Sequence, residues 1–418
     1  MFIENYKVKN RELILLLVII FTGLFTGIIT TYLLNNLDQW YLVLAFILSF
    51  LLLYKPIFGI ITIIVLAPFG TFVVVDGLGT ISRYLGILTL VSFSIRLLFA
   101  GNVKIIIPRE IYWFGMFILF GFVSILWANS ASTVITRSFT LIQLTILYII
   151  TYNLLSSNPK NYRYIYISIL IVGVSISVFS LLILVRAQGI NYFTRISVAR
   201  DIDVNHLAAF LLIPFWISFY YFKDKSKIYI VPLLLISIAI IITQSRSALI
   251  VLMIVLLFYF ILNKKSLKSI LTFLLLSIFI LWIVPDQYFY RFTSFISDKE
   301  LILSAGGGRG YIWSFGWELF KSSPLYGTGL GNFIWIFRPP HSLFIQIISE
   351  LGIIGLILFS IFLYKLFLSH RLVNDLELYI AISIFLMSLT VDIFYTHYFL
   401  LMLSLYSVKK KTKLSETS

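Results

Sequence analysis

The chain has 418 residues, of which 60% are hydrophobic and only 12% are charged, and this balance excludes a soluble globular domain. It contains no cysteine, so disulfides and thiolate metal sites are excluded as well. A net charge of +15 would suggest nucleic acid as the partner of a soluble protein. In so apolar a chain the basic residues are first explained by membrane topology, and we expect no nucleic-acid partner.

Apolar runs of the length that crosses a bilayer, roughly 17–25 residues, recur along almost the whole chain. The first of them is too long for the apolar region of a cleavable signal and has no small-residue cleavage site, so we expect it to remain as a span. The sequence predicts an all-α, polytopic helical membrane protein with about 12–14 transmembrane helices in a single domain, residues 1–418. The fourteen candidate spans are 13–34, 40–54, 57–75, 84–100, 111–128, 137–155, 164–185, 206–222, 228–244, 247–263, 267–284, 341–364, 377–393 and 396–408.

The basic residues give the orientation of these spans. With both termini in the cytoplasm, all lysines except Lys299 and Lys321 fall on the inner side, as the positive-inside rule requires. Arginine has the opposite bias. Because the planar guanidinium fork suits phosphate, the outward arginines predict an extracytoplasmic site for a phosphate-bearing ligand; the alternative is that individual arginines only contact lipid headgroups. The outward arginines are Arg83, Arg137, Arg186, Arg195, Arg200, Arg246, Arg291, Arg309 and Arg338.

One long polar segment, residues 285–340, interrupts the apolar pattern. Loops of this length are usually functional or disordered, and its many aromatic residues argue against disorder. We expect an ordered extracytoplasmic active-site loop. Trp313 and Trp317 lie one helical turn apart on a short interfacial helix, as interfacial anchors or as platforms for sugar rings. The glycines of Gly327–Phe333 lack the strand-to-helix setting of a dinucleotide loop and predict tight backbone turns.

A second extracytoplasmic loop is expected at residues 186–205. Its Asp201 and Asp203 form a D-x-D pair that could hold a divalent cation, but the bare motif is weak. The structural alternative is that Asp203 or Asn205 caps the following helix. The loop's candidates for contact with an anion are Arg195 and Arg200.

Two further residues lie at predicted outer membrane boundaries. Arg246 follows a tight hairpin, and a charge so close to hydrocarbon is a functional candidate unless it extends to the lipid phosphates. His341 opens a span next to Arg338. Neutral imidazole accepts a proton near pH 7, which makes His341 a candidate general base. Glu350, further along the same span, is expected to orient polar neighbours or to pair with a buried arginine.

Four segments in this order resemble the O-antigen ligase and Wzy-type polysaccharide polymerase superfamily. His341-Ser342 stands where the family more often has His-Asn. The segments are NHLAAFLLIP (205–214), TQSRSALIVL (243–252), RGYIWSFGWELFKSSPLYGTGLGNF (309–333) and HSLFIQIISELGIIGL (341–356).

The resemblance implies a metal-independent glycosyltransferase, without a cofactor, in the bacterial plasma (inner) membrane. Its donor is an undecaprenyl-diphosphate-linked oligosaccharide and its acceptor is a sugar hydroxyl; membrane lipid and a chain-length regulator protein are further expected partners. His341 matches the family's catalytic histidine, and Arg309 and Arg246 match its essential arginines. Substrate contacts are expected from Arg195, Arg200, Arg338, Arg291, Trp313 and Trp317.

The preferred interpretation is polymerisation of lipid-linked repeat units into O-antigen, capsule or exopolysaccharide. The alternative within the family is ligase-type transfer to lipid A core, a wall component or a protein. A different class, a flippase for the lipid-linked glycan, should place charges near the midplane of several spans. Arg96 comes nearest to this, and it lies close to a cytoplasmic end.

Overall fold

The computed structural model describes residues 49, 52–69, 74–75, 79–99, 104–186, 203–264, 309–368 and 374–417. Within these ranges, six helices are long and apolar enough to cross a membrane, and shorter apolar helices accompany them. The predicted polytopic all-α membrane fold is therefore confirmed. The predicted spans 13–34 and 267–284, most of the span 40–54, most of the 186–205 loop and the first part of the 285–340 loop lie outside the described ranges.

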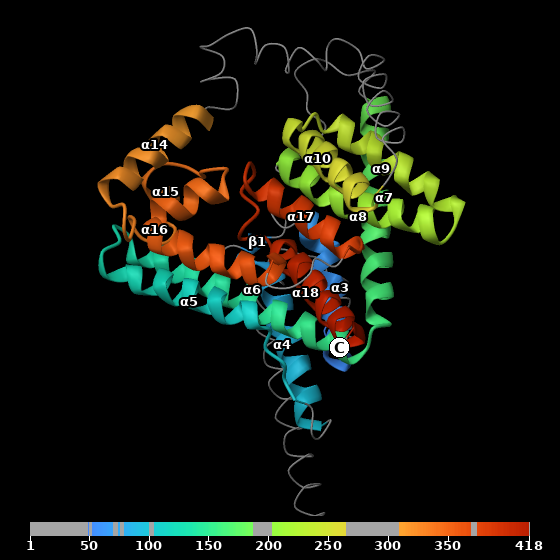
Figure 1. The fold of residues 1–418 in the computed structure, drawn as a ribbon, viewed down its shortest axis with the longest axis horizontal. Coiled ribbons are helices and arrows are strands. Elements are labelled where there is room, and N and C mark those ends of the chain that lie inside the picture. Colours follow the sequence, from blue (N-terminus) through green and yellow to red (C-terminus); the bar gives the residue numbers. More distant parts are fainter. Residues whose placement is uncertain are drawn as a thin grey trace, which may run out of the picture.

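The predicted spans within these ranges correspond to helices (Figure 1). The first of them, expected at 57–75, already ends at Leu66. A short 3-10 turn, Ala67–Phe69, follows, because Pro68 has no N–H to donate and its ring would clash with the carbonyl group of Ile64 in a continued α-helix. The elements are α3 (Pro56–Leu66), the antiparallel two-residue strands β1 (Val74–Val75) and β2 (Gly79–Thr80), α4 (Ile81–Phe99), α5 (Arg109–Val123), α6 (Ala131–Ser157), α7 (Asn161–Arg186), α8 (Val204–Asp224), α9 (Ile230–Ile242), α10 (Arg246–Leu262), α14 (Arg309–Ser322), α15 (Asn332–Ile336), α16 (Leu343–Leu363), α17 (Leu376–Ser388) and α18 (His397–Thr417).

Helices α8 and α18 form the centre of the bundle. Every residue of α8 from Leu207 to Ser218 is buried, as expected for a helix that is apolar on all sides. The indole N–H of Trp216 donates to Ser383 Oγ of α17 at 2.8 Å, and its ring stacks on Tyr379 with 5.2 Å between centroids. In α18 the run Phe399–Leu403 is fully enclosed, mainly by α6 and α17.

Successive helices run back and forth, so their ends gather on two opposite sides. On one, the lysine side, Lys410 Nζ donates to the carbonyl oxygens of Lys365 at 3.0 Å and Leu366 at 2.6 Å and thereby caps the last turn after α16. On the other, the arginine side, Leu330 N donates to Ser124 Oγ at 2.9 Å. Many of the described basic residues divide accordingly, with Arg163 an exception on the first side and Lys321 on the second. Lys104, Lys160, Lys225, Lys365 and Lys409 belong to the first side, and Arg83, Arg137, Arg246, Arg309 and Arg338 to the second.

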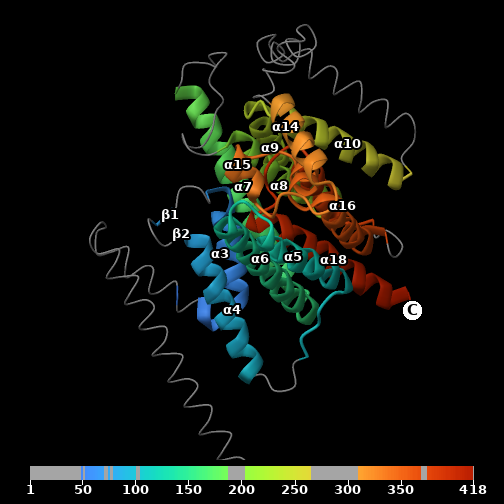
Figure 2. The same ribbon diagram turned by 90° about the vertical axis from the view of Figure 1, so that its left-hand side faces the viewer.

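On the arginine side, α14 and α15 lie together against α16 (Figures 1 and 2). Helix α16 is broken at Gly352, whose φ of 62° and ψ of −159° suit glycine alone. The two N–H groups that follow the break donate to the carbonyl oxygens of Pro324 and Leu325 at 2.9 and 3.2 Å. Backbone groups freed inside a membrane helix need such partners, and the loop after α14 provides them.

The same loop satisfies the carbonyl groups before the break. Thr328 N and Gly329 N donate to the carbonyl oxygens of Ser349 and Glu350 at 3.0 and 2.8 Å. Gly327 has a φ of +68°, and a Cβ there would lie 2.3 Å from the carbonyl carbon of Glu350. The predicted tight turns are thus confirmed, and these turns cap a broken helix.

We expect Gly352→Ala to destabilise the protein markedly. The added Cβ would lie 2.5 Å from the carbonyl atoms of Leu325, and the backbone angles are strained for any other residue, at a cost of about 1–3 kcal/mol. Thermal unfolding of the purified protein in detergent measures the effect. The control is Gly115→Ala in α5, where the new Cβ would meet no atom within 4 Å. An equal loss in both variants would contradict this role of the break.

Candidate functional site

His341 lies in the turn between α15 and α16 and has a left-handed backbone with a φ of +50°, an uncommon conformation for any residue except glycine. Two contacts hold this turn. Trp313 Nε1 of α14 donates to the carbonyl oxygen of Pro340 at 3.1 Å, and the side chain of Ser342 caps α16 by accepting from Ile345 N at 3.5 Å. The imidazole is therefore presented by a fixed turn at the start of a membrane helix.

Arg309 is the first residue of α14, and close packing brings this helix onto α16. At Gly316, a Cβ would lie 2.4 Å from the Ile345 side chain, so only glycine allows this approach. The side chain of Arg309 is partly buried, and burial lowers the pKa of its guanidinium from the ordinary value, an effect that Asp203 opposes. Arginine nevertheless stays charged in proteins.

The charges around His341 define the site. Burial lowers the pKa of the imidazole below its ordinary value of 6.5, and the neighbouring Arg309 guanidinium lowers it further; Asp392 and Asp203 act in the opposite direction, and His206 lowers it. The two largest effects, burial and the charge of Arg309, both favour the neutral imidazole. We call these five residues, His341, Arg309, Asp203, His206 and Asp392, the His341 cluster.

The start of α8 belongs to this cluster. Asp203 caps α8 by accepting from Asn205 N at 2.7 Å, which confirms the capping alternative. Ser245 Oγ donates to Asn205 Oδ1 at 3.1 Å, so the tight turn between α9 and α10 is fastened to the start of α8. Arg246 comes directly after Ser245 as the first residue of α10. Arg246, the arginine that the sequence predicts for this turn, therefore follows directly after a residue that contacts the start of α8.

Glu350 is a fully buried residue of α16. Its Oε2 accepts from Gly331 N at 2.8 Å, so the carboxylate orients the glycine-rich loop, one of its two predicted roles. For the other role, the candidate is Arg137 of α6, which lies within electrostatic range of the carboxylate. The Arg137 guanidinium is 4.4 Å from the centroid of the Tyr395 ring. Tyr395 belongs to the connection between α17 and α18, so Arg137 lies next to this connection.

The other described binding candidates make contacts of their own. Trp317 is 44% exposed and packs on Phe320 with 5.0 Å between ring centroids, whereas the indole N–H of Trp313 is used to hold the turn before His341. Arg338 is exposed, and its guanidinium lies 5.0 Å from the ring centroid of the adjacent Phe337. Three predicted residues lie outside the described ranges: Arg195, Arg200 and Arg291.

The structure adds two residues to which the sequence reasoning gave no catalytic role. His206 is in the first turn of α8. Asp392 lies in the short connection between α17 and α18. The sequence marks Asp392 as a carboxylate at the outer end of a predicted helical hairpin. Ionisable residues near hydrocarbon are functional candidates.

Comparison with known families gives one match: residues 231–360 correspond to the family described as O-antigen ligase. The matched region begins in α9 and includes Arg246, Arg309 and His341, whereas Asp203, His206 and Asp392 lie outside it. No curated protein and no solved structure matches the chain. The family match indicates a membrane glycosyltransferase of the polymerase or ligase type.

Proposed function

We propose that this chain, a member of the O-antigen ligase and Wzy-type polymerase superfamily, transfers a glycan from a polyprenyl-diphosphate donor to a sugar hydroxyl on the arginine side of the membrane. The observation that carries the proposal is the partly buried His341 on its fixed turn, whose imidazole pKa is lowered by burial and by the adjacent Arg309. A neutral imidazole next to a fixed guanidinium combines a base with a site for an anion.

In the proposed reaction, His341 accepts the proton of the acceptor hydroxyl while that oxygen attacks the anomeric carbon of the donor. The bond between the anomeric carbon and the diphosphate oxygen breaks, and its electron pair leaves with the polyprenyl diphosphate. Arg309 and Arg246 stabilise the negative charge that develops there, because fixed cations are most effective in a site with little water. Asp392 and Asp203 keep the imidazole basic enough to take the proton.

We propose polymerisation rather than ligation, so that the acceptor is the terminal sugar of another lipid-linked repeat unit. Incubation of the purified protein with the undecaprenyl-diphosphate-linked repeat alone tests this. A ladder of chain lengths supports a polymerase, whereas product formed only after addition of a second acceptor supports a ligase. Movement of the lipid-linked unit between leaflets without a new glycosidic bond would contradict both and favour a flippase.

The rate should depend on pH through His341. Because the neutral ring is the active form and its pKa is lowered, activity should be complete near pH 7 and fall only as the pH drops well below 6.5. Asp392→Asn removes a negative charge that raises this pKa, so the acid limb of the pH–rate profile should move to still lower pH. A limb that stays in place or moves upward in this variant would show that another group titrates.

Chelation should leave the reaction unchanged. In the proposed mechanism the guanidinium groups of Arg309 and Arg246 provide the positive charge for the diphosphate, so no divalent cation is needed. We expect the rate of EDTA-treated protein, assayed in metal-free buffer, to stay within about twofold of the untreated rate. A change of about 1.4 kcal/mol in the activation free energy would alter the rate tenfold. Loss of activity on chelation and its recovery on addition of Mg²⁺ or Mn²⁺ would contradict this assignment.

A further inference from the structure

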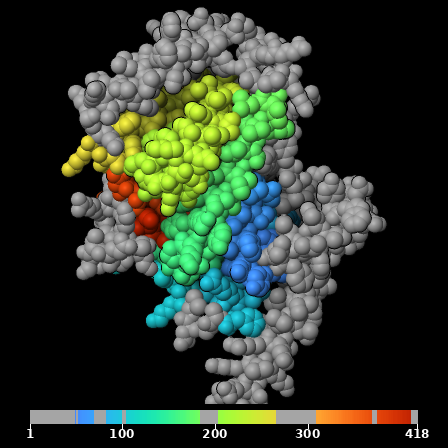
Figure 3. Space-filling model, turned by 90° about the vertical axis from the view of Figure 1, so that its right-hand side faces the viewer, coloured from blue at the N-terminus to red at the C-terminus, as the bar shows by residue number. Residues whose placement is uncertain are grey.

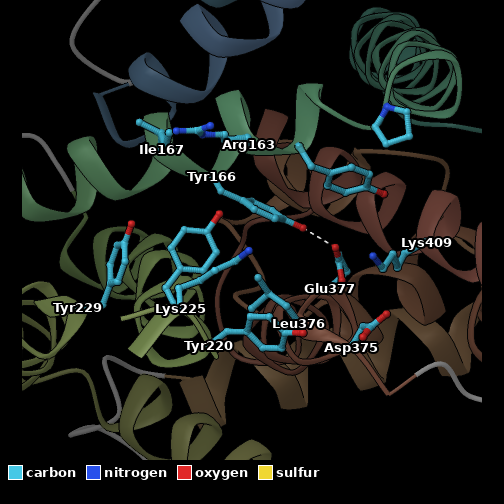
Figure 4. A pocket seen from close by; sticks show the side chains of 13 residues that line it. Arg163, Tyr166, Ile167, Tyr220, Lys225, Tyr229, Asp375, Leu376, Glu377 and Lys409 are labelled. Carbon is cyan, nitrogen blue, oxygen red and sulfur yellow. Dashed lines mark hydrogen bonds between the residues drawn. The ribbon is translucent and has the colours of Figure 1, made fainter. Parts of the chain in front are cut away.

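A polar cavity lies on the lysine side, opposite the His341 cluster. It has a volume of about 470 Å³ and is formed where the ends of α7, α8, α17 and α18 meet (Figure 4). Helix α8 extends from Asp203 to this cavity, and its 21 residues, at 1.5 Å per residue, put roughly 30 Å between the two sites. The cavity is therefore separate from the proposed catalytic centre.

The inner wall of the cavity is fixed by buried polar contacts. The hydroxyl of Tyr166 donates to Glu377 Oε1 at 2.5 Å, and both residues are buried. Glu377, a second lining carboxylate, Asp375, and the cation Lys409 lie together at one end of the cavity (Figure 4). Further hydroxyl groups line the cavity from Tyr220, Tyr221 and Tyr229.

Two further cations lie at the opening, so that three cations and two carboxylates line the cavity. Arg163 of α7 and Lys225, directly after α8, both line the cavity and are exposed. Within the described part of the chain, neither side chain forms an ion pair. Figure 4 shows Lys225 extending into the cavity and Arg163 on its rim next to Ile167. A guanidinium and an ammonium at one opening, backed by tyrosine hydroxyls, suit a phosphate group.

An apolar stripe leads away from this opening along α7. Ile167 lines the cavity and continues into Ile171, Val178 and Leu182, all exposed and spaced to lie on one face of the helix. In the space-filling view, α7 crosses an open face between α9 and α3 (Figure 3). A long acyl chain could lie along this stripe while its headgroup occupies the cavity, whereas a water-soluble anion would make no use of the stripe.

We propose that the cavity binds the phosphate headgroup of an anionic phospholipid from the leaflet on the lysine side, with an acyl chain along the exposed stripe of α7. Basic pockets between membrane helices on the cytoplasmic side are typical sites for such headgroups. The bound lipid joins the ends of α7, α8 and α17, and it is chemically distinct from the diphosphate donor proposed for the opposite side.

Lipid binding to the full-length protein in a neutral detergent tests this proposal. Short-chain phosphatidylglycerol is titrated while bound lipid is counted by native mass spectrometry; phosphatidylcholine with the same chains and free glycerol phosphate are titrated separately. The Arg163→Gln/Lys225→Gln variant should bind phosphatidylglycerol at least about tenfold more weakly, since it loses charge-assisted hydrogen bonds to phosphate. The control variant, Lys160→Gln/Lys227→Gln, loses the same charge outside the cavity lining and should bind as the unchanged protein does.

Three results would overturn the proposal. Equal affinity for phosphatidylglycerol and phosphatidylcholine would exclude a site for an anionic headgroup. Equal affinity for glycerol phosphate would exclude any part for the acyl chain. An equal loss in both double variants would show that only the general positive charge of this side attracts lipid. Thermal unfolding of each variant without added lipid checks that all of them are folded.

Discussion

His341→Asn is expected to reduce the rate of glycosyl transfer by about 10²–10⁴-fold, the usual effect of removing a general base. Asparagine is chosen because it tolerates the left-handed backbone that residue 341 adopts, whereas alanine would add strain to the loss of the base. The amide of asparagine accepts no proton near pH 7. The variant therefore changes the chemistry and leaves the turn before α16 intact.

The measurement is the initial rate with lipid-linked repeat units, on protein whose amount and thermal unfolding match those of the unchanged chain. In the variant the acid limb of the pH–rate profile should disappear, because the group that titrates is gone. A variant that still builds full-length polymer at a normal rate, or that keeps the same acid limb, would rule out His341 as the base.

Much of the fold follows from the sequence, because apolar runs of membrane-spanning length determine where helices form. The helices α7 to α10 and α16 correspond to predicted spans within three residues, whereas α6 begins six residues before its predicted span and α18 extends nine residues beyond its own. The break in α16 could not be predicted in this way. Gly352 and Gly355 both occur in the same apolar run, and only the docking of the loop at Pro324 and Leu325 decides that the first of them adopts a positive φ.

The sequence also predicts part of the candidate site. Arg309 and His341 could be singled out by residue type and by their place at membrane boundaries, but their proximity depends on packing. It requires Gly316, which lets α14 approach α16, and the bond from Trp313 to Pro340. Asp392 was missed because no local pattern connects it to His341, from which it is separated by the whole of α16 and α17.

Arg309→Gln should lower the rate of transfer by about 10²–10³-fold, comparable with the loss of one preorganised donor to a developing negative charge. It should also change the pH dependence. Because the Arg309 guanidinium helps to lower the pKa of His341, its removal should move the acid limb of the pH–rate profile upward, toward 6.5. Arg309→Lys keeps the positive charge but loses the planar fork, so its rate should fall while the acid limb stays near its original position.

The matched control is Lys321→Gln, which removes an exposed cation at the far end of α14, paired with Glu318 at 2.9 Å. Its rate and its acid limb should stay close to those of the unchanged protein. Kinetics across the pH range on the three variants separate a specific role from general charge. If Lys321→Gln and Arg309→Gln lost equal activity, both residues would act only through the summed field of the membrane surface. If Arg309→Gln lowered the rate but left the acid limb unmoved, the guanidinium would not act on the imidazole, and the proposed pairing of base and anion site would be wrong.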